Sequence, residues 1–254
     1  VFAGLLPKLF NRHGLIVSVT LKQEEYPAFE EAFGALQQSF SQEVFPTASL
    51  DWEIKPENEG LTSSSRVQYV GKGANFLRLG YRYTGSMAVL ETLLRYDYFW
   101  TKVRVQGGAY GAFTGFNRNG FMYFGSYRDP NLRETISVFD GTADYAAHFT
   151  ASEREMDKFI IGTMSGVDTP LTPMMKGDAA ATCYLRGITQ EDRQQRRDEI
   201  LSTRQEDIRA LAPLIAACMK ENVLCVFGND AKIAEAKDVF DSIHPALPAL
   251  DEAE

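Results

Sequence analysis

The chain has 254 residues, of which 44% are hydrophobic and 24% charged, a composition typical of a globular protein with a sizeable buried core. Its formal net charge of -8 argues against a nucleic-acid partner, because neutralising phosphates requires clustered cations. No apolar run reaches the roughly 18 residues that a membrane-spanning helix needs, so no membrane partner is expected. The same charge is compatible with a mildly acidic cleft that favours basic peptides.

The first residues and the cysteines bear on processing and location. No basic segment precedes the apolar residues after Val1, so a signal peptide is not predicted, and residues 1–10 are interpreted as a linker remnant. Cys183, Cys218 and Cys225 are odd in number and lack metal-binding spacing. They are expected to be reduced and mostly buried, which favours a bacterial cytoplasm, with an organellar matrix as the alternative.

The first third of the chain predicts a strand, a helix and a long surface segment. Gly14–Leu21 is apolar and β-branched, which predicts a buried strand. Aromatic and leucine residues at helical spacing predict an amphipathic helix over about 25–41. Prolines, Gly60 and a serine cluster predict a surface excursion over 42–65.

The middle of the chain predicts strands around a helix. Residues 66–70 and 75–83 are expected to be two strands, interrupted by Gly71-Lys72-Gly73. A helix is predicted from Gly85 to about Lys102, and a glycine-rich strand follows it. Asn119-Gly120 is typical of a β-hairpin turn and predicts a strand over 121–127.

The last part is predicted to be mainly helical. Asp129-Pro130 is typical of a helix start, and Ser152-x-x-Glu155 and Thr203-x-x-Glu206 of capping boxes. A late strand over 223–227 and a final helix over about 231–241 complete the pattern. Together these elements predict an α+β fold with a mixed, mainly antiparallel sheet covered by helices.

Several motifs are incomplete for the chemistry that they suggest. Gly71-x-Gly73 is not followed by a third glycine or a helix, and Gly107-Gly108 lacks the Lys-Ser/Thr ending of a phosphate loop, so nucleotide binding is rejected. The three histidines, His13, His148 and His244, are scattered and form no metal-binding motif. No metal site is expected in this chain.

The stretch Lys102–Phe113 is the most informative one, because it places Arg104 and Tyr110 around a glycine pair. From the residues alone, an ion-paired arginine and an ordinary strand tyrosine remain the favoured interpretation. The motifs around these two residues favour a functional interpretation instead.

Nearly the whole chain resembles the C-terminal portion of presequence-protease-type peptidases, a subfamily of the pitrilysin/insulysin inverzincins. The resemblance is carried by the stretches Asn11–Thr20, Val67–Gly73, Val103–Gly111, Ser126–Asn131, Phe139–Ala143, Ile160–Thr163 and Arg196–Thr203. It implies one C-terminal domain over residues 1–254, with a LuxS/pitrilysin-like metallopeptidase fold that is a non-zinc-binding copy.

In that family, four related domains form two halves that close around an unfolded peptide. The resemblance implies that Zn²⁺ and the general base lie in the N-terminal half, which this chain lacks. It also implies that Arg104 and Tyr110 reach the scissile peptide from the last domain.

The chemistry of these two side chains suits that role. A guanidinium and a phenol are both hydrogen-bond donors at pH 7, and donors aimed at a developing oxyanion accelerate acyl transfer. Gly107, Gly108 and Gly111 are interpreted as substrate-binding positions where the backbone closely approaches the peptide.

The predicted function is therefore substrate binding and transition-state stabilisation in a zinc metallopeptidase that degrades unstructured peptides. Its partners are unfolded peptides and the zinc-bearing half of the same polypeptide, and the fragment is expected to be inactive alone. A non-catalytic scaffold or peptide-binding module of the same fold remains the alternative.

Overall fold

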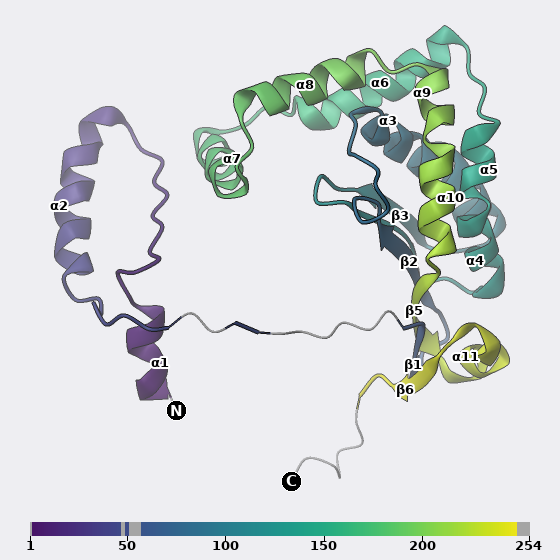
Figure 1. Ribbon diagram of the computed structural model, residues 1–254, viewed down its shortest axis with the longest axis horizontal. Helices are drawn as coiled ribbons and strands as arrows, with labels where there is room; N and C mark the ends of the chain where they lie inside the picture. Colours follow the sequence, from purple (N-terminus) through teal and green to yellow (C-terminus); the bar gives the residue numbers. More distant parts are fainter. Residues whose placement is uncertain (1, 47–48, 51–56, 248–254) are drawn as a thin grey trace. The chain divides into compact units, whose positions relative to one another are not determined.

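The computed structural model describes residues 2–46, 49–50 and 57–247 (Figure 1). The chain forms two compact units. The smaller unit comprises residues 1–54 and 170–190, and the larger one residues 55–169 and 191–254. The prediction that all 254 residues form a single domain stays a prediction.

The described part of the smaller unit contains the α-helices α1 (Phe2–Leu9), α2 (Tyr26–Gln37) and α7 (Pro173–Arg186), and a 3-10 helix at Gln23–Glu25. Helix α2 confirms the amphipathic helix predicted here, although it ends earlier than expected. The strand predicted over Gly14–Leu21 is wrong, because this segment is extended but pairs with no other strand. Its apolar side chains Ile16, Val17 and Val19 are exposed rather than buried.

The larger unit contains a six-stranded sheet in the order β3-β4-β2-β5-β1-β6. Its strands are β1 (Glu59–Ser63), β2 (Tyr69–Asn75), β3 (Gly111–Phe116), β4 (Phe121–Tyr127), β5 (Val223–Asn229) and β6 (Ser242–Pro245). The pairs β3–β4, β4–β2 and β2–β5 are antiparallel, whereas β5–β1 and β1–β6 are parallel. The predicted mixed, mainly antiparallel α+β fold is confirmed.

Helices cover one face of this sheet, as Figure 1 shows for α4 and α10, which contact β2, while α5 and α9 pack against α10. The helices of the larger unit are α3 (Ser86–Leu93), α4 (Arg133–Asp140), α5 (Thr142–Ala147), α6 (Glu153–Val167), α8 (Gln190–Leu201), α9 (Gln205–Ala210), α10 (Ala212–Lys220) and α11 (Asp230–Glu235). The first residue of α8 belongs to the smaller unit.

Strand alternation explains why one face carries the core. In β4, Met122 and Phe124 are fully buried under the helices, while Phe121 and Tyr123 point to the other face and are exposed. The Phe124 ring packs edge-on against Phe99, with 5.0 Å between ring centroids. The core therefore lies between the helices and one side of the sheet.

An ion pair with one buried partner crosses the same layer. Lys72 of β2 is almost fully buried, and its Nζ lies 2.6 Å from Asp140 Oδ1 at the end of α4. The pair links the centre of the sheet to the covering helix.

Two predictions about strands are wrong. The surface excursion over 42–65 contains β1, which lies between β5 and β6, while residues 47–48 and 51–56 lie outside the described residues. Strand β2 runs through Gly71 and Gly73 instead of being interrupted there, and residues 76–80 form a turn. Gly73 keeps the strands close, because a Cβ at this position would lie 2.5 Å from the Met122 carbonyl oxygen.

Several helix boundaries also differ from the predictions. Helix α4 begins at Arg133 rather than at Asp129-Pro130, and the N-cap of α9 is Arg204 rather than Thr203. The helix predicted over 231–241 ends at Glu235, and β6 follows where no strand was predicted. By contrast, the Ser152–Glu155 capping box of α6 is confirmed.

Two further predictions concern burial and membrane association. Among the three cysteines only Cys218 is buried, whereas Cys225 is exposed and Cys183 is intermediate, so the expectation that they are mostly buried is wrong. No described helix combines the length and apolar character that crossing a membrane requires.

Candidate functional site

Arg104 lies on a helical segment, not on the strand predicted for the glycine-rich stretch. Helix α3 continues into π-helical turns over Leu94–Tyr98 and Trp100–Gln106. These turns place Arg104 four residues after Trp100, and the guanidinium carbon lies 4.1 Å from the centroid of the Trp100 ring. The stacking holds the arginine over an aromatic face.

A tight turn connects this helical segment to β3. Gly107 ends the helix, and a Cβ there would lie 2.5 Å from the Val103 carbonyl oxygen. Gly108 adopts φ +78°, a left-handed conformation that favours glycine. Tyr110 then donates its backbone N–H to the Tyr127 carbonyl at 3.1 Å, which starts the pairing with β4.

Gly111 is the first residue of β3 and lies opposite Tyr127 in β4. A Cβ at Gly111 would find its nearest neighbour at 3.6 Å, so packing does not require glycine there. Local backbone geometry explains Gly107 and Gly108, while the substrate-binding role of all three glycines stays a prediction.

Arg104 and Tyr110 line one open cavity of about 620 Å³. Its walls are mainly aromatic, and they comprise Arg95, Tyr96, Trp100, Arg104, Tyr110, Gly111, Ala112, Phe113 and Tyr127. This group of residues is called the aromatic cleft below. The cleft holds two arginines and no carboxylate, so it is not the acidic cleft that the net charge allowed.

The two predicted catalytic side chains have free donor groups. Among the described residues, neither the Arg104 guanidinium nor the Tyr110 hydroxyl forms a hydrogen bond or an ion pair with another side chain. Arg95, by contrast, is paired with Glu91 at 2.8 Å. Tyr110 is 67% exposed, so its hydroxyl is accessible to a ligand in the cleft.

A buried loop over residues 128–131 supports the turn. Asp129 is fully buried, and its carboxylate accepts hydrogen bonds from Thr135 Oγ1 at 2.7 Å and from the Asn131 backbone N–H at 2.9 Å. Asn131 Nδ2 in turn donates to the Gly107 carbonyl at 2.5 Å. Burial raises the pKa of Asp129, although these hydrogen bonds oppose the shift.

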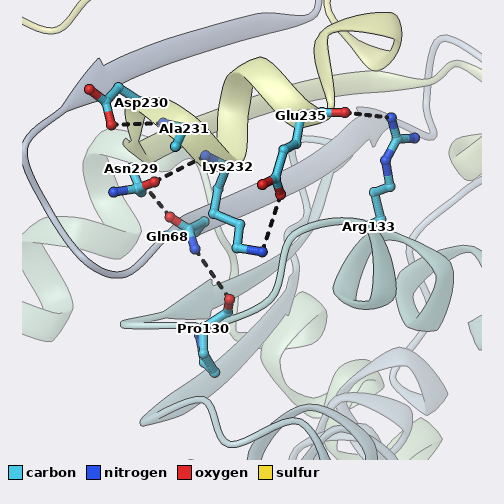
Figure 2. Close-up of polar contacts among 8 residues, drawn as sticks. All are labelled: Gln68, Pro130, Arg133, Asn229, Asp230, Ala231, Lys232 and Glu235. Carbon is cyan, nitrogen blue, oxygen red and sulfur yellow. Dashed lines mark hydrogen bonds and ion pairs between the residues drawn. The ribbon is translucent and has the colours of Figure 1, made fainter.

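Gln68, which is also fully buried, ties the loop to the sheet (Figure 2). Its Nε2 donates to the Pro130 carbonyl at 3.4 Å, and its Oε1 accepts the Asn229 backbone N–H at 3.0 Å. The backbones of Gln68 and Asp129 exchange two hydrogen bonds of 2.7 and 2.8 Å. The loop is thus fixed from three directions.

The described residues contain no group of three His, Cys, Asp or Glu side chains that could hold a metal ion. His148 is paired with Asp144 of its own helix, and the His13 ring contacts the Gln42 carbonyl. The residues present therefore do not fit a zinc site.

The sequence singled out Arg104 and Tyr110, whose catalytic role stays a prediction, but gave no role to the residues that support them. Asp129 was interpreted as a helix cap, and Gln68 and Asn131 received no role. The signal was a run of polar residues, Ser126–Asn131, directly after a strand that alternates apolar and exposed side chains.

Comparison with known proteins gives a consistent result. The family model described as the PreP C-terminal domain matches residues 58–228. The chain is 43% identical over 239 residues to protein HypA of Clostridium perfringens, covering 94% of this chain and 25% of that protein. It is 32% identical over 235 residues to presequence protease 1, chloroplastic/mitochondrial, of Arabidopsis thaliana, covering 91% of this chain and 21% of that protein.

Solved structures share the fold at low sequence identity. Pitrilysin matches with a TM-score of 0.58 at 12% identity, over 89% of this chain and 25% of that one. An inactive domain of peptidase M16 from Pseudomonas fluorescens matches with a TM-score of 0.52 at 14% identity, over 82% of this chain and 50% of that one. The chain spans about a quarter of the length of the two curated relatives.

Proposed function

The chain belongs to the PreP C-terminal domain family, within the pitrilysin-type M16 peptidases, and on this basis we propose that it binds unfolded peptides for cleavage. In the proposal, the aromatic cleft holds the peptide, and Arg104 and Tyr110 contact the carbonyl oxygen of the bond to be cut. The peptidase activity belongs to the longer polypeptide of which this chain is the C-terminal portion.

The observation that carries the proposal is the pair of free donors in one cleft. An arginine that merely stabilised the fold would be expected to face a carboxylate, as Arg95 does. Arg104 instead stacks on Trp100, and its N–H groups donate no hydrogen bond to another described side chain. The Tyr110 hydroxyl, in the same cleft, likewise donates none. Both groups can therefore donate to a ligand without breaking an existing bond.

Their chemistry suits a carbonyl that gains negative charge. Guanidinium and phenol donors, held by stacking and by the rigid 107–110 turn, need little reorganisation when the charge develops. Asn131 fixes the Gly107 carbonyl and thereby the turn that carries Tyr110. Each donor is expected to contribute about 10²–10³ in rate.

The edge of the sheet supports peptide binding as well. Strand β3 is at the end of the strand order and pairs only with β4 among the described strands, so its outer backbone groups have no strand partner. An extended peptide can pair with such an edge through its backbone, which tolerates varied sequences. This suits a peptidase that degrades peptides without strict sequence preference.

In this proposal Zn²⁺ is held by residues outside those described, because the described ones form no metal-binding group. The N-terminal half of the longer polypeptide is the expected location. The isolated chain should then neither bind zinc tightly nor cleave peptides. Its cellular compartment, cytoplasm or organellar matrix, stays a prediction.

The test is made in the longer peptidase that contains this chain. Arg104→Ala should lower kcat/KM about 10²–10³-fold while leaving zinc content and the free energy of unfolding unchanged. Arg78→Ala is the matched control, because Arg78 is exposed on the turn after β2 and lies outside the cleft.

Equal kcat/KM values for Arg104→Ala and Arg78→Ala would contradict the proposal. They would favour the alternative, in which the domain is a scaffold or a peptide-binding module without a part in the chemistry. Chelator-sensitive cleavage by the isolated chain would contradict the assignment of zinc to another region.

A further inference from the structure

A continuous row of aromatic rings leads out of the aromatic cleft across the face of the sheet opposite the helices of the larger unit. Tyr110 and Tyr127 of the cleft are in edge contact, with 5.9 Å between ring centroids. Tyr127 in turn contacts Tyr69 of β2 at 5.2 Å, and Tyr69 contacts Phe227 of β5 at 5.5 Å. The row thus crosses three neighbouring strands, β4, β2 and β5.

Beside this row two paired glycines leave a part of the sheet surface without side chains, and this part is named the hollow. Gly71 of β2 and Gly125 of β4 are directly paired, and the next strand places Cys225 opposite Gly71. Phe113 of β3 lies opposite Gly125 and belongs to the aromatic cleft, so it borders the two glycines on the side of the cleft. Directly paired residues in antiparallel strands lie about 4.5–5.5 Å apart, so the two glycines leave a gap wide enough for a side chain.

The fold does not require glycine at either position. Neither residue has a positive φ, and a Cβ would find its nearest neighbour at 3.6 Å for Gly71 and 3.7 Å for Gly125. Gly73 differs, because a Cβ there would collide with the Met122 carbonyl oxygen at 2.5 Å. Glycine inside a strand costs roughly 0.5–1 kcal/mol relative to alanine, so two unneeded glycines side by side point to a role outside folding.

The face is also uncharged. Between β3 and β5, the residues that point to this side are aromatic, glycine, valine, cysteine or asparagine, and Glu59 of β1 is the first carboxylate along the row. Tyr123, Phe113 and Phe227 remain more than a third exposed. Such a surface suits neutral, bulky apolar side chains rather than acidic or basic ones.

We propose that the bound peptide continues from the aromatic cleft across this face and seats a bulky apolar side chain over Gly71 and Gly125. The occupant is an unfolded peptide with phenylalanine- or leucine-like residues on the side away from the cut bond. This inference rests on the proposed function, since the aromatic row starts at the residues of the candidate site. The continuity of the rings with the cleft selects the peptide, rather than a second protein copy, as the occupant.

Cys225 provides a direct test, because it lies beside Gly71 on this face. In the 254-residue chain, the alkylation rates of Cys225 and Cys183 are measured by mass spectrometry with and without a Gly/Ser-rich peptide that carries phenylalanines. Cys183 belongs to the other unit and is the internal control, while Cys218 is buried. Because burial raises the pKa of the Cys225 thiol, both arms are measured at one alkaline pH.

The peptide should slow the alkylation of Cys225 several-fold and leave Cys183 unchanged. A matched peptide with serine in place of phenylalanine should protect neither cysteine. A Cβ at Gly125 would have no neighbour closer than 3.7 Å, so Gly125→Val places its side chain in the hollow and should weaken peptide binding about tenfold, which corresponds to about 1.4 kcal/mol. Gly166→Val is the control on α6, where a Cβ has no neighbour within 4 Å.

Three results would overturn the inference. The first is no protection of Cys225 up to the solubility limit of the peptide, and the second is equal protection of both cysteines. The third is protection that appears on raising the chain concentration without peptide, because a second copy would then cover the face. None of these results bears on Arg104, whose test is kcat/KM in the longer peptidase, so the two failures can be told apart.

Discussion

The two faces of the sheet use the same strands for different purposes. On the covered face, Met122, Phe124 and Val226 have no exposed surface and pack beneath the helices. On the other face, Tyr123 and Phe227 alternate with them along the same strands and remain exposed. An aromatic side chain thus contributes to stability on one face and to a candidate peptide-binding surface on the other.

The glycines show the same division. Gly73 is required by the close approach of β4, whereas Gly71, two residues earlier in β2, has free space above it. Residue type alone therefore does not tell which glycine is required by the fold. The distance from an added Cβ to its nearest neighbours distinguishes the two glycines.

The largest expected effect on stability comes from emptying the covered face. Phe124→Ala should lower the free energy of unfolding by about 3–5 kcal/mol, because it leaves a cavity among buried aromatic rings. Phe113→Ala, at an exposed position on the other face, should cost far less. Urea unfolding of both variants measures the difference, and equal losses would contradict the division between the faces.

A smaller effect on stability is expected from substitutions of Gly71 and Gly73, the two glycines within β2. Gly73→Ala should destabilise the fold by about 1–3 kcal/mol, because backbone atoms of β4 must move to accept the methyl group. Gly71→Ala should be neutral or stabilise it by up to about 1 kcal/mol, since the space is free and the unfolded chain loses entropy. Thermal unfolding of the two single variants compares them, and a costly Gly71→Ala would show that the hollow is structural.

The smallest effect concerns a single proton on Asp129. Its folded pKa is raised by burial, so the native state holds this proton to higher pH than the unfolded state does. Stability from this group is present below the ordinary carboxyl pKa and is lost as the pH rises through the folded pKa. Asp129→Asn should flatten that part of the curve of unfolding free energy against pH, and an unchanged curve would contradict the assignment.

Local signals in the sequence predicted local structure well. Asn119-Gly120 predicted the β3–β4 hairpin, because turn chemistry depends on adjacent residues. Ser152 and Glu155 likewise predicted the start of α6. Arg104 and Tyr110 were proposed as site residues only because of the motifs around them, since neither residue is unusual alone, and their role stays a prediction.

Long-range pairing could not be predicted in the same way. Strand β1 was interpreted as part of a surface loop because Gly60 and the serine cluster resemble a linker, yet β5 and β6 flank it in the sheet. A Cβ at Gly60 would meet Ile233 of α11, so its glycine reflects a neighbour more than a hundred residues away in the chain. Asp129 was mistaken for a helix cap for the same reason, because its burial depends on Gln68 and Thr135.

A pair of hydroxyl deletions in the same cleft tests the proposed contact between the Tyr110 hydroxyl and the peptide. Tyr110→Phe and Tyr127→Phe each keep the ring and remove one oxygen, and kcat/KM of both is measured in the longer peptidase. We expect a loss of about 10²-fold for Tyr110→Phe and almost none for Tyr127→Phe. Equal kcat/KM values for the two variants would contradict it.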